Sequence, residues 1–186
     1  MGDLLMSELL IGCGNRRDKL LYRPGEGEWT NLTTLDSDPN CGADVEHDLM
    51  RLPLPFADDS FNEIHAYHVL EHTGAMGDYR WFFAQWEEFW RILKPDGLFC
   101  GVVPAVSSVW LFADPGHTRV IAPETFTFLD QSEYTKQVGK TALADYRRFY
   151  HADFAALFQD ARTSDDGGDC QFFFILQAKK PSRISV

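Results

Sequence analysis

An amphipathic segment followed by a tight turn and an apolar run limits the fold most strongly. From Tyr79 to Leu93, aromatic and aliphatic residues recur at helical spacing, and charged residues fill the opposite face. A Lys-Pro-Asp-Gly turn at residues 94–97 ends this predicted helix, and an unalternated apolar run follows at residues 98–103. Such a run is typical of a strand buried on both faces of a sheet. A helix, a turn and a buried strand in this order form half of a βαβ unit.

Further apolar runs predict more strands of the same sheet. They lie at residues 8–11, 32–35, 62–66 and 171–178. Residues 15–29 contain proline and glycines without a helical period, so we expect at most one helical turn after Gly14 and then a loop. Strands that alternate with helices imply a three-layer α/β sandwich, in which ligands bind at the carboxyl ends of the strands. We expect one domain over residues 1–186.

Charge and cysteine content exclude several classes of protein. The chain has 28 acidic and 17 basic side chains, a formal net charge of −11, which argues against a protein that neutralises nucleic-acid phosphates. Its four cysteines are far apart without a CxxC pair, and the sequence has neither a secretory leader pattern nor a run of about 20 apolar residues. We therefore expect a soluble, cytoplasmic protein with reduced thiols and without nucleic-acid or membrane partners.

Short polar motifs end the first two predicted strands. Glycines at positions 12 and 14 let the backbone approach a nucleotide closely. Asp36 follows Gly14 by 22 positions, at the end of the next strand, where a carboxylate can accept both hydroxyls of a ribose. Arg17 stands where a dinucleotide-binding loop has its third glycine, which disfavours NAD and FAD. The predicted ligand is an adenosine compound without a pyrophosphate.

These motifs and four others resemble, in order, those of class I S-adenosylmethionine-dependent methyltransferases, particularly the short bacterial and phage-type members. The matching segments are Leu10–Asn15, Thr34–Pro39, His47–Leu49, Leu52–Phe61, His68–His72 and Ile92–Gly97. The resemblance implies a Rossmann-like three-layer sandwich with a mostly parallel central sheet and an antiparallel C-terminal strand. It implies S-adenosylmethionine as cofactor and methyl transfer to a small-molecule or glycan acceptor, on oxygen by preference and on nitrogen second.

The resemblance also implies which residues contact the cofactor. The loop after the first strand would face the methionine part, Asp36 the ribose and Asp48 the adenine amino group. The acidity of the chain suits this cationic cofactor. The predicted cofactor-binding residues are Gly12, Cys13, Gly14, Asn15, Asp36, Ser37, Asp48, Leu49, Tyr67 and His68.

Two departures from the family pattern affect the prediction. Leu10 replaces the acidic residue that relatives have two positions before the first glycine, so that contact is missing or comes from Glu8 or elsewhere. The chain also begins only a few residues before the first strand, without the N-terminal helices that relatives fold over their substrates. We therefore expect residues 105–150 to form a substrate-side insertion or lid.

A loop after the strand at 98–103 concentrates acid–base groups near the expected acceptor. His117 has the pKa range to take a proton from an acceptor hydroxyl or amine, with Asp114 or Arg119 orienting the substrate. The equally weighted alternative is a loop held by its own polar side chains. Four basic residues form the one basic concentration near this side and indicate either an anionic acceptor or a solvated face: Lys136, Lys140, Arg147 and Arg148.

Two other functions compete with methyl transfer. One is a non-catalytic protein that binds S-adenosylmethionine or S-adenosylhomocysteine. The other is a zinc hydrolase, because His68 and His72 form an H-x-x-E-H pattern with Glu71, which on a helix places two imidazoles on one face. The sequence signals no clear downstream ligand, so we favour a site without metal in which Glu71 and His72 fix the loop.

Overall fold

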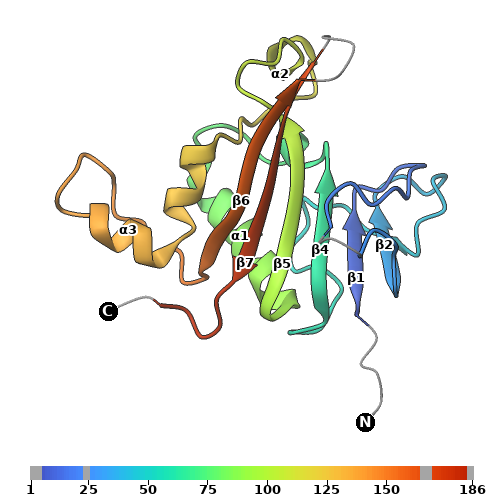
Figure 1. Ribbon diagram of the computed structural model, residues 1–186, viewed down its shortest axis with the longest axis horizontal. Coiled ribbons are helices and arrows are strands. Elements are labelled where there is room, and N and C mark those ends of the chain that lie inside the picture. Colours follow the sequence, from blue (N-terminus) through green and yellow to red (C-terminus); the bar gives the residue numbers. More distant parts are fainter. Residues whose placement is uncertain (1–5, 23–25, 164–168, 184–186) are drawn as a thin grey trace.

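The computed structural model describes residues 6–22, 26–163 and 169–183 and contains one seven-stranded sheet. Its order is β3-β2-β1-β4-β5-β7-β6 (Figure 1). Strands β1 to β5 are parallel, and β7 runs antiparallel to both β5 and β6. This confirms the predicted Rossmann-like fold with its antiparallel C-terminal strand. The strands are β1 (Glu8–Ile11), β2 (Leu32–Asp36), β3 (Val45–Glu46), β4 (Phe61–Tyr67), β5 (Leu93–Pro104), β6 (Phe154–Thr163) and β7 (Cys170–Ala178).

The strand order reverses at β1, which lies between β2 and β4. Chain connections leave in opposite directions at such a point, so a crevice opens beyond the carboxyl ends of these strands. The polar motifs after β1, β2 and β4 meet at this crevice.

Helix α1 (Tyr79–Ile92) matches the predicted helix and supplies one wall of the core. Asp78 caps its first turn by accepting a hydrogen bond from the Trp81 amide at 3.1 Å. The buried Trp86 and Phe89 pack on Phe99 of β5, with ring centroids 4.9 Å away in both pairs. Strand β5 is longer than predicted, because its pairing with β4 includes the residues around the turn and shifts register there.

The opposite face near β1 carries a loop, as predicted: residues 15–22 and 26–31, the described parts of this connection, contain no helix. Where a helix would otherwise pack on the sheet, this face has a buried ionic network. Lys19 Nζ lies 2.5 Å from Glu8 Oε1 and 3.1 Å from Glu63 Oε2. Burial disfavours the Lys19 ammonium, but its hydrogen bonds to the two glutamates outweigh this and raise its pKa. Glu8 is thus held within the fold and does not line the crevice.

Residues 105–150 contain three short helices and divide into two parts. They are α2 (Trp110–Ala113), η2 (Pro123–Phe128) and α3 (Gln131–Gln137). Helix α2 lies beyond the carboxyl ends of the strands, whereas α3 lies beside the sheet near the C-terminal end of the described chain (Figure 1). The second part also contributes Phe126 and Leu129 to the core. Along the described ranges, every helix is too short or too polar to cross a membrane.

Candidate functional site

The loop after β1 is shaped by two glycines with positive φ. Gly12 has φ +59° and Gly14 has φ +47°, a conformation that favours glycine. A Cβ on Gly12 would also overlap the Val69 side chain. The Gly14 amide donates to Asp36 Oδ2 at 2.8 Å, and the Asp38 amide donates to Oδ1 at 2.9 Å. Asp36 therefore joins the loops after β1 and β2 and retains acceptor capacity on both oxygens.

Arg17 links the same two loops through its guanidinium. Its guanidinium donates to the Gly14 carbonyl at 2.7 Å and to the Cys41 carbonyl at 3.2 Å. In a dinucleotide-binding loop, the third glycine, at the position of Arg17, lies at the start of a helix. The structure has no helix there, and Arg17 acts as a clamp on backbone carbonyls.

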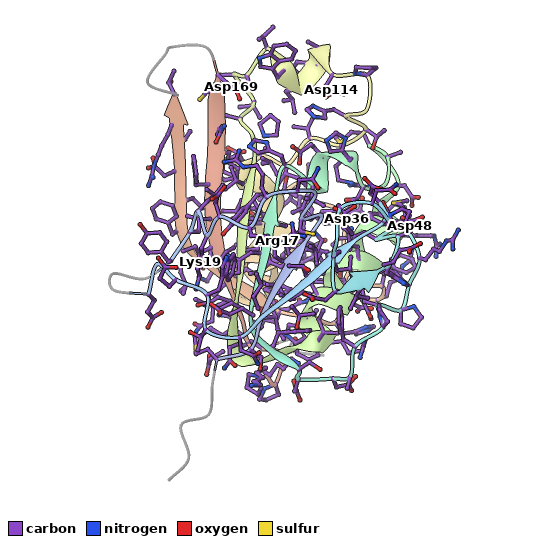
Figure 2. The ribbon with its side chains drawn as sticks, turned by 90° about the vertical axis from the view of Figure 1, so that its right-hand side faces the viewer. Arg17, Lys19, Asp36, Asp48, Asp114 and Asp169 are labelled. Atoms are coloured by element: carbon purple, nitrogen blue, oxygen red, sulfur yellow. The ribbon has the colours of Figure 1, made fainter. Side chains whose placement is uncertain are left out.

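Two cavities open at the crevice and share Gly12 and His68. The first, of about 290 Å³, includes the ends of β2 and β3, and the second, of about 360 Å³, includes the loop after β1. Each is near the lower end of the range for small-molecule sites, about 300–1,000 Å³. Figure 2 shows Asp36 and Asp48 in the same region, with Asp114 farther along, beside α2. The first cavity contains Gly12, Asp36, Ser37, Asp48, Leu49 and His68, and the second contains Gly12, Cys13, Gly14, Asn15, Tyr67 and His68.

All ten predicted cofactor-binding residues therefore line one of the two cavities. Other residues of the walls are not among the predicted cofactor-binding residues, although Leu10, His47 and His72 belong to the matching segments. Their position next to the motifs is the one available signal. They include Leu10, Arg16, Asp18 and Leu20 in the second cavity and His47, Met50, Val69, His72 and Thr73 in the first.

Tyr67 positions the wall of the second cavity. Its hydroxyl accepts from the amides of Leu20 and Leu21 at 3.2 and 3.3 Å and lies 2.6 Å from Nδ1 of His65. Burial raises the pKa of Tyr67, so the phenol stays protonated and donates to His65. Tyr67 thus fixes the 19–21 segment over the sheet.

The loop after α2 docks on the turn after β4. The backbone carbonyl of Glu71 accepts from the amides of Thr118 and Arg119 at 2.9 and 3.1 Å. The Arg119 guanidinium donates to the carbonyls of Thr73 and Ala75 at 3.1 and 2.7 Å, and burial lowers its pKa. The idea that Arg119 orients a substrate is wrong, because its donors bind backbone carbonyls and fix the loop.

His117, the predicted acid–base residue, lies beside the first cavity and is absent from its lining. Its side chain is 8% exposed, and Nε2 lies 3.8 Å from Asp114 Oδ2. The His117 ring packs against His72, with centroids 4.6 Å apart. His72 does line the first cavity. This end of the first cavity is therefore lined by His72, and His117 packs against the far side of His72.

The geometry of the zinc-hydrolase alternative is not formed. His68 has φ +57°, and the helical turn η1 covers only Leu70–His72. His68 and His72 thus do not share one helical face, which the H-x-x-E-H arrangement requires. In the described residues, the metal-ligating group at this turn contains Glu71, His72 and His117, and not His68.

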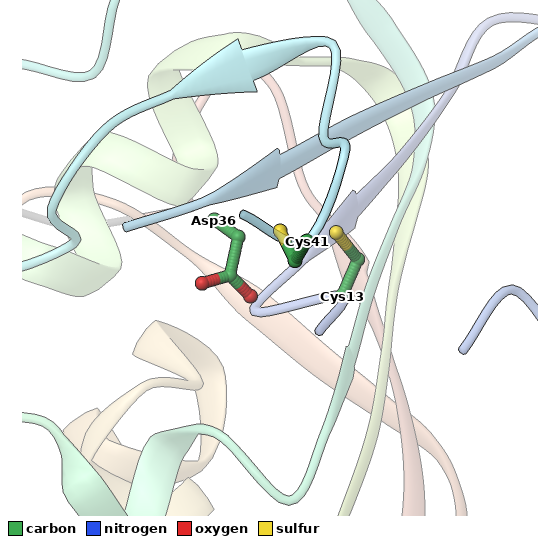
Figure 3. A group of neighbouring side chains, drawn as sticks. All are labelled: Cys13, Asp36 and Cys41. Carbon is green, nitrogen blue, oxygen red and sulfur yellow. The ribbon is translucent and has the colours of Figure 1, made fainter. Parts of the chain in front are cut away.

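Cys13, Asp36 and Cys41 form another compact group (Figure 3). Metal binding by cysteine needs the thiolate. Burial raises the pKa of the Cys13 thiol to about 11, so it is protonated at neutral pH. The Asp36 oxygens already accept backbone hydrogen bonds. In the structure, Cys13 and Cys41 pack with Leu10 in a small apolar cluster under the loop after β1.

Three of the four basic residues predicted near the acceptor, all except Lys140, have local side-chain partners in the described chain. Lys136 pairs with Glu133 at 2.5 Å on the surface of α3, and Arg147 pairs with Asp145 at 2.8 Å. Arg148 lies over the Phe149 ring at 4.6 Å. These contacts favour the solvated face over the anion site.

Solved structures of S-adenosylmethionine-dependent methyltransferases are similar to this chain. One from Archaeoglobus fulgidus has a TM-score of 0.55 and 16% identity, over 94% of this chain and 86% of that one. The N-methyltransferase NodS from Bradyrhizobium japonicum WM9 has a TM-score of 0.57 and 12% identity, over 95% and 87%. NodS has also been solved in complex with S-adenosyl-l-homocysteine. The [4+2]-cyclase SpnF has a TM-score of 0.53 and 14% identity, over 94% and 74%.

Sequence comparison adds nothing to this: no protein-family model and no curated protein matches the chain. At identities of 12–16%, likeness of structure establishes the fold and leaves the reaction open. The chain has the Rossmann-like fold that these methyltransferases share.

Proposed function

We propose that this protein is an S-adenosylmethionine-dependent methyltransferase. The observation that carries the proposal is the pair of cavities that meet at Gly12 and His68. One offers carboxylates suited to a ribose and an adenine amino group, and the other offers a glycine loop suited to the methionine part. The S-adenosyl-l-homocysteine held by NodS, a protein of the same fold, supports the cofactor assignment.

In this proposal the crevice binds and orients the cofactor without covalent chemistry. Asp36 accepts the ribose hydroxyls with the lone pairs that Gly14 and Asp38 leave unused. One Asp48 oxygen accepts from the Met50 amide at 2.8 Å, and the other, 3.8 Å from Arg51 Nε, accepts from the adenine amino group in this proposal. Methyl transfer is an in-line displacement, so holding the acceptor against the methyl group supplies most of the rate.

The acceptor side is proposed to be the segment 105–119, with a small molecule or glycan as substrate and oxygen as the preferred acceptor atom. Helix α2 exposes apolar side chains beyond the strand ends, with Trp110 55% and Phe112 77% exposed. Such exposed apolar groups beside a polar crevice are typical of a binding surface. His117, which packs against His72, is the proposed acid–base residue for the acceptor.

Calorimetric titration with S-adenosylmethionine and S-adenosylhomocysteine tests the cofactor site. We expect micromolar binding to the full chain and a loss of about 10- to 150-fold in Asp36→Ala, since hydrogen bonds to a charged group contribute about 1.5–3 kcal/mol. Asp38→Ala is the matched control, because Asp38 is exposed on the same turn and lines neither cavity. Binding of neither compound, or equal binding by both variants, would contradict the proposal.

A cofactor-binding protein with different chemistry is the second candidate. The [4+2]-cyclase SpnF has the same fold, and Leu10 provides no carboxylate for the cofactor's ammonium. Transfer of a labelled methyl group to a panel of hydroxyl and amine acceptors distinguishes the two. Labelled product supports the methyltransferase, whereas conversion of an acceptor without label supports the alternative.

A further inference from the structure

Three side chains with metal-ligating atoms converge where η1 meets the loop after α2. One ligand atom each from Glu71, His72 and His117 lies within 4.8 Å of the other two. Backbone hydrogen bonds fix this approach, because the Glu71 carbonyl accepts from two successive amides of the loop, those of Thr118 and Arg119. The cluster is therefore built by the fold and does not depend on flexible surface side chains.

Two members of the cluster carry buried polar atoms that lack partners. Glu71 is 1% exposed, and within the described ranges neither of its carboxylate oxygens accepts a hydrogen bond. His68 Nδ1 lies 3.4 Å from Glu71 Oε1, which makes an ion pair when His68 is protonated but no hydrogen bond. Nδ1 of His117 is also buried without a partner in the described chain. Buried carboxylates are normally paired or bound to metal ions, and one cation here would satisfy both groups.

Of the remaining ring nitrogens, that of His72 has the kind of partner that metal-binding histidines use, and that of His117 lies beside a carboxylate beyond hydrogen-bond distance. Nδ1 of His72 lies 3.1 Å from the Gly116 carbonyl, so a proton there donates to that oxygen and leaves Nε2 free for an ion. Nε2 of His117 faces Asp114 Oδ2 at 3.8 Å, which leaves Nδ1 free. Gly116 permits this approach, because a Cβ there would lie only 3.2 Å from His72 Nδ1.

We propose that Glu71, His72 and His117 bind one divalent transition-metal ion of the Mn²⁺ to Zn²⁺ series. Two imidazoles and one carboxylate are a ligand set that leaves coordination positions open for other groups. Side-chain adjustment would bring the ligand atoms from within 4.8 Å to about 3–3.5 Å of one another, the spacing around such an ion. The H-x-x-E-H pattern includes Glu71 and His72 but does not reveal this site, because the third ligand, His117, follows His72 by 45 positions.

The ion also identifies the class of acceptor, and this step rests on the proposed function. His72 lines the first cavity together with His68, so open metal positions face the crevice in which the proposed cofactor binds. A hydroxyl bound to the ion loses its proton to solvent more readily than a free one. Its oxygen then bonds to the methyl carbon, the carbon–sulfur bond breaks with its electron pair on sulfur, and S-adenosylhomocysteine leaves. The acceptor is therefore an alcohol or phenol.

Metal titration of the full chain tests the site. Protein treated with a chelator is titrated with Mn²⁺ and with Zn²⁺ in a calorimeter, and we expect one ion per chain. Affinity falls at least about tenfold in Glu71→Gln, His72→Ala and His117→Ala. His72 is exposed, so His72→Ala keeps the fold. His151→Ala is the control and binds like the original chain, because His151 is a surface imidazole with one carboxylate partner, Glu87 at 3.3 Å.

Two results would overturn the proposal: no stoichiometric ion, or binding that survives in all three variants. Zn²⁺ binding lost in Cys13→Ser but kept in His72→Ala would also overturn it, because the ion would then lie at the cysteine pair. S-adenosylhomocysteine binding is measured on the same samples. Protein that binds the ion but not this compound refutes the methyltransferase and retains the ion site, whereas the reverse refutes the ion site alone.

Discussion

At the scale of single residues, Gly12 is a position where backbone conformation and packing both require glycine. Gly42 is a natural comparison, since it also has positive φ, +69°, but a Cβ there would meet nothing within 4 Å. Gly42→Ala should lower the free energy of unfolding by about 1–2 kcal/mol, the cost of a left-handed conformation. Gly12→Ala should lower it by about 1–3 kcal/mol more, because the Val69 side chain must move, and should abolish S-adenosylhomocysteine binding. Urea unfolding measures the free energy of unfolding of each variant, and calorimetry measures its binding of S-adenosylhomocysteine. Equal losses in the two variants would contradict the packing argument.

At the scale of elements, the loop after β1 depends on the ionic network of Lys19. Lys19→Met leaves Glu8 and Glu63 as buried carboxylates without their ammonium, so we expect the free energy of unfolding to fall by about 3–5 kcal/mol. Lys136→Met removes an exposed pair of similar length and should change it by less than about 1 kcal/mol. Urea unfolding of the two variants compares these losses in the free energy of unfolding. A loss below about 1 kcal/mol in Lys19→Met would mean that the loop is not anchored by this network.

Some elements of this fold can be predicted from the sequence and others cannot. Strands β1, β2, β4, β5 and β7 and helix α1 are predicted because apolar periodicity follows burial directly. Strand β6 was missed, because it is an edge strand with mostly exposed positions and little apolar pattern. The crevice residues were predicted from local motifs. The roles of Arg17, Arg119 and Lys19 depend on carbonyls and carboxylates distant in sequence, which no local pattern reveals.

At the scale of the whole molecule, the network makes stability depend on pH through His65. Burial lowers the pKa of His65 below its usual 6.5, and neutral His65 donates from Nε2 to Glu63 at 2.9 Å and accepts from Tyr67 on Nδ1. In the unfolded chain, His65 binds a proton near pH 6.5, whereas in the folded chain it stays neutral to a lower pH. The contribution to the free energy of unfolding is therefore complete above pH 6.5 and is lost as the pH falls below it. Urea unfolding between pH 8 and pH 5 should show this decline, and His65→Gln should flatten it. An unchanged slope in His65→Gln would assign the decline to other groups.

The most direct measurement is a crystal structure of the chain grown with S-adenosylhomocysteine. The account predicts one molecule across both cavities, with the ribose hydroxyls on Asp36, the adenine amino group on Asp48 and the methionine part along residues 12–15. The sulfur should lie near His68, on the side of the crevice that leads to His72. A ligand bound elsewhere, or a crevice that stays empty at saturating concentration, would contradict the central claim that this crevice is a methyl-donor site.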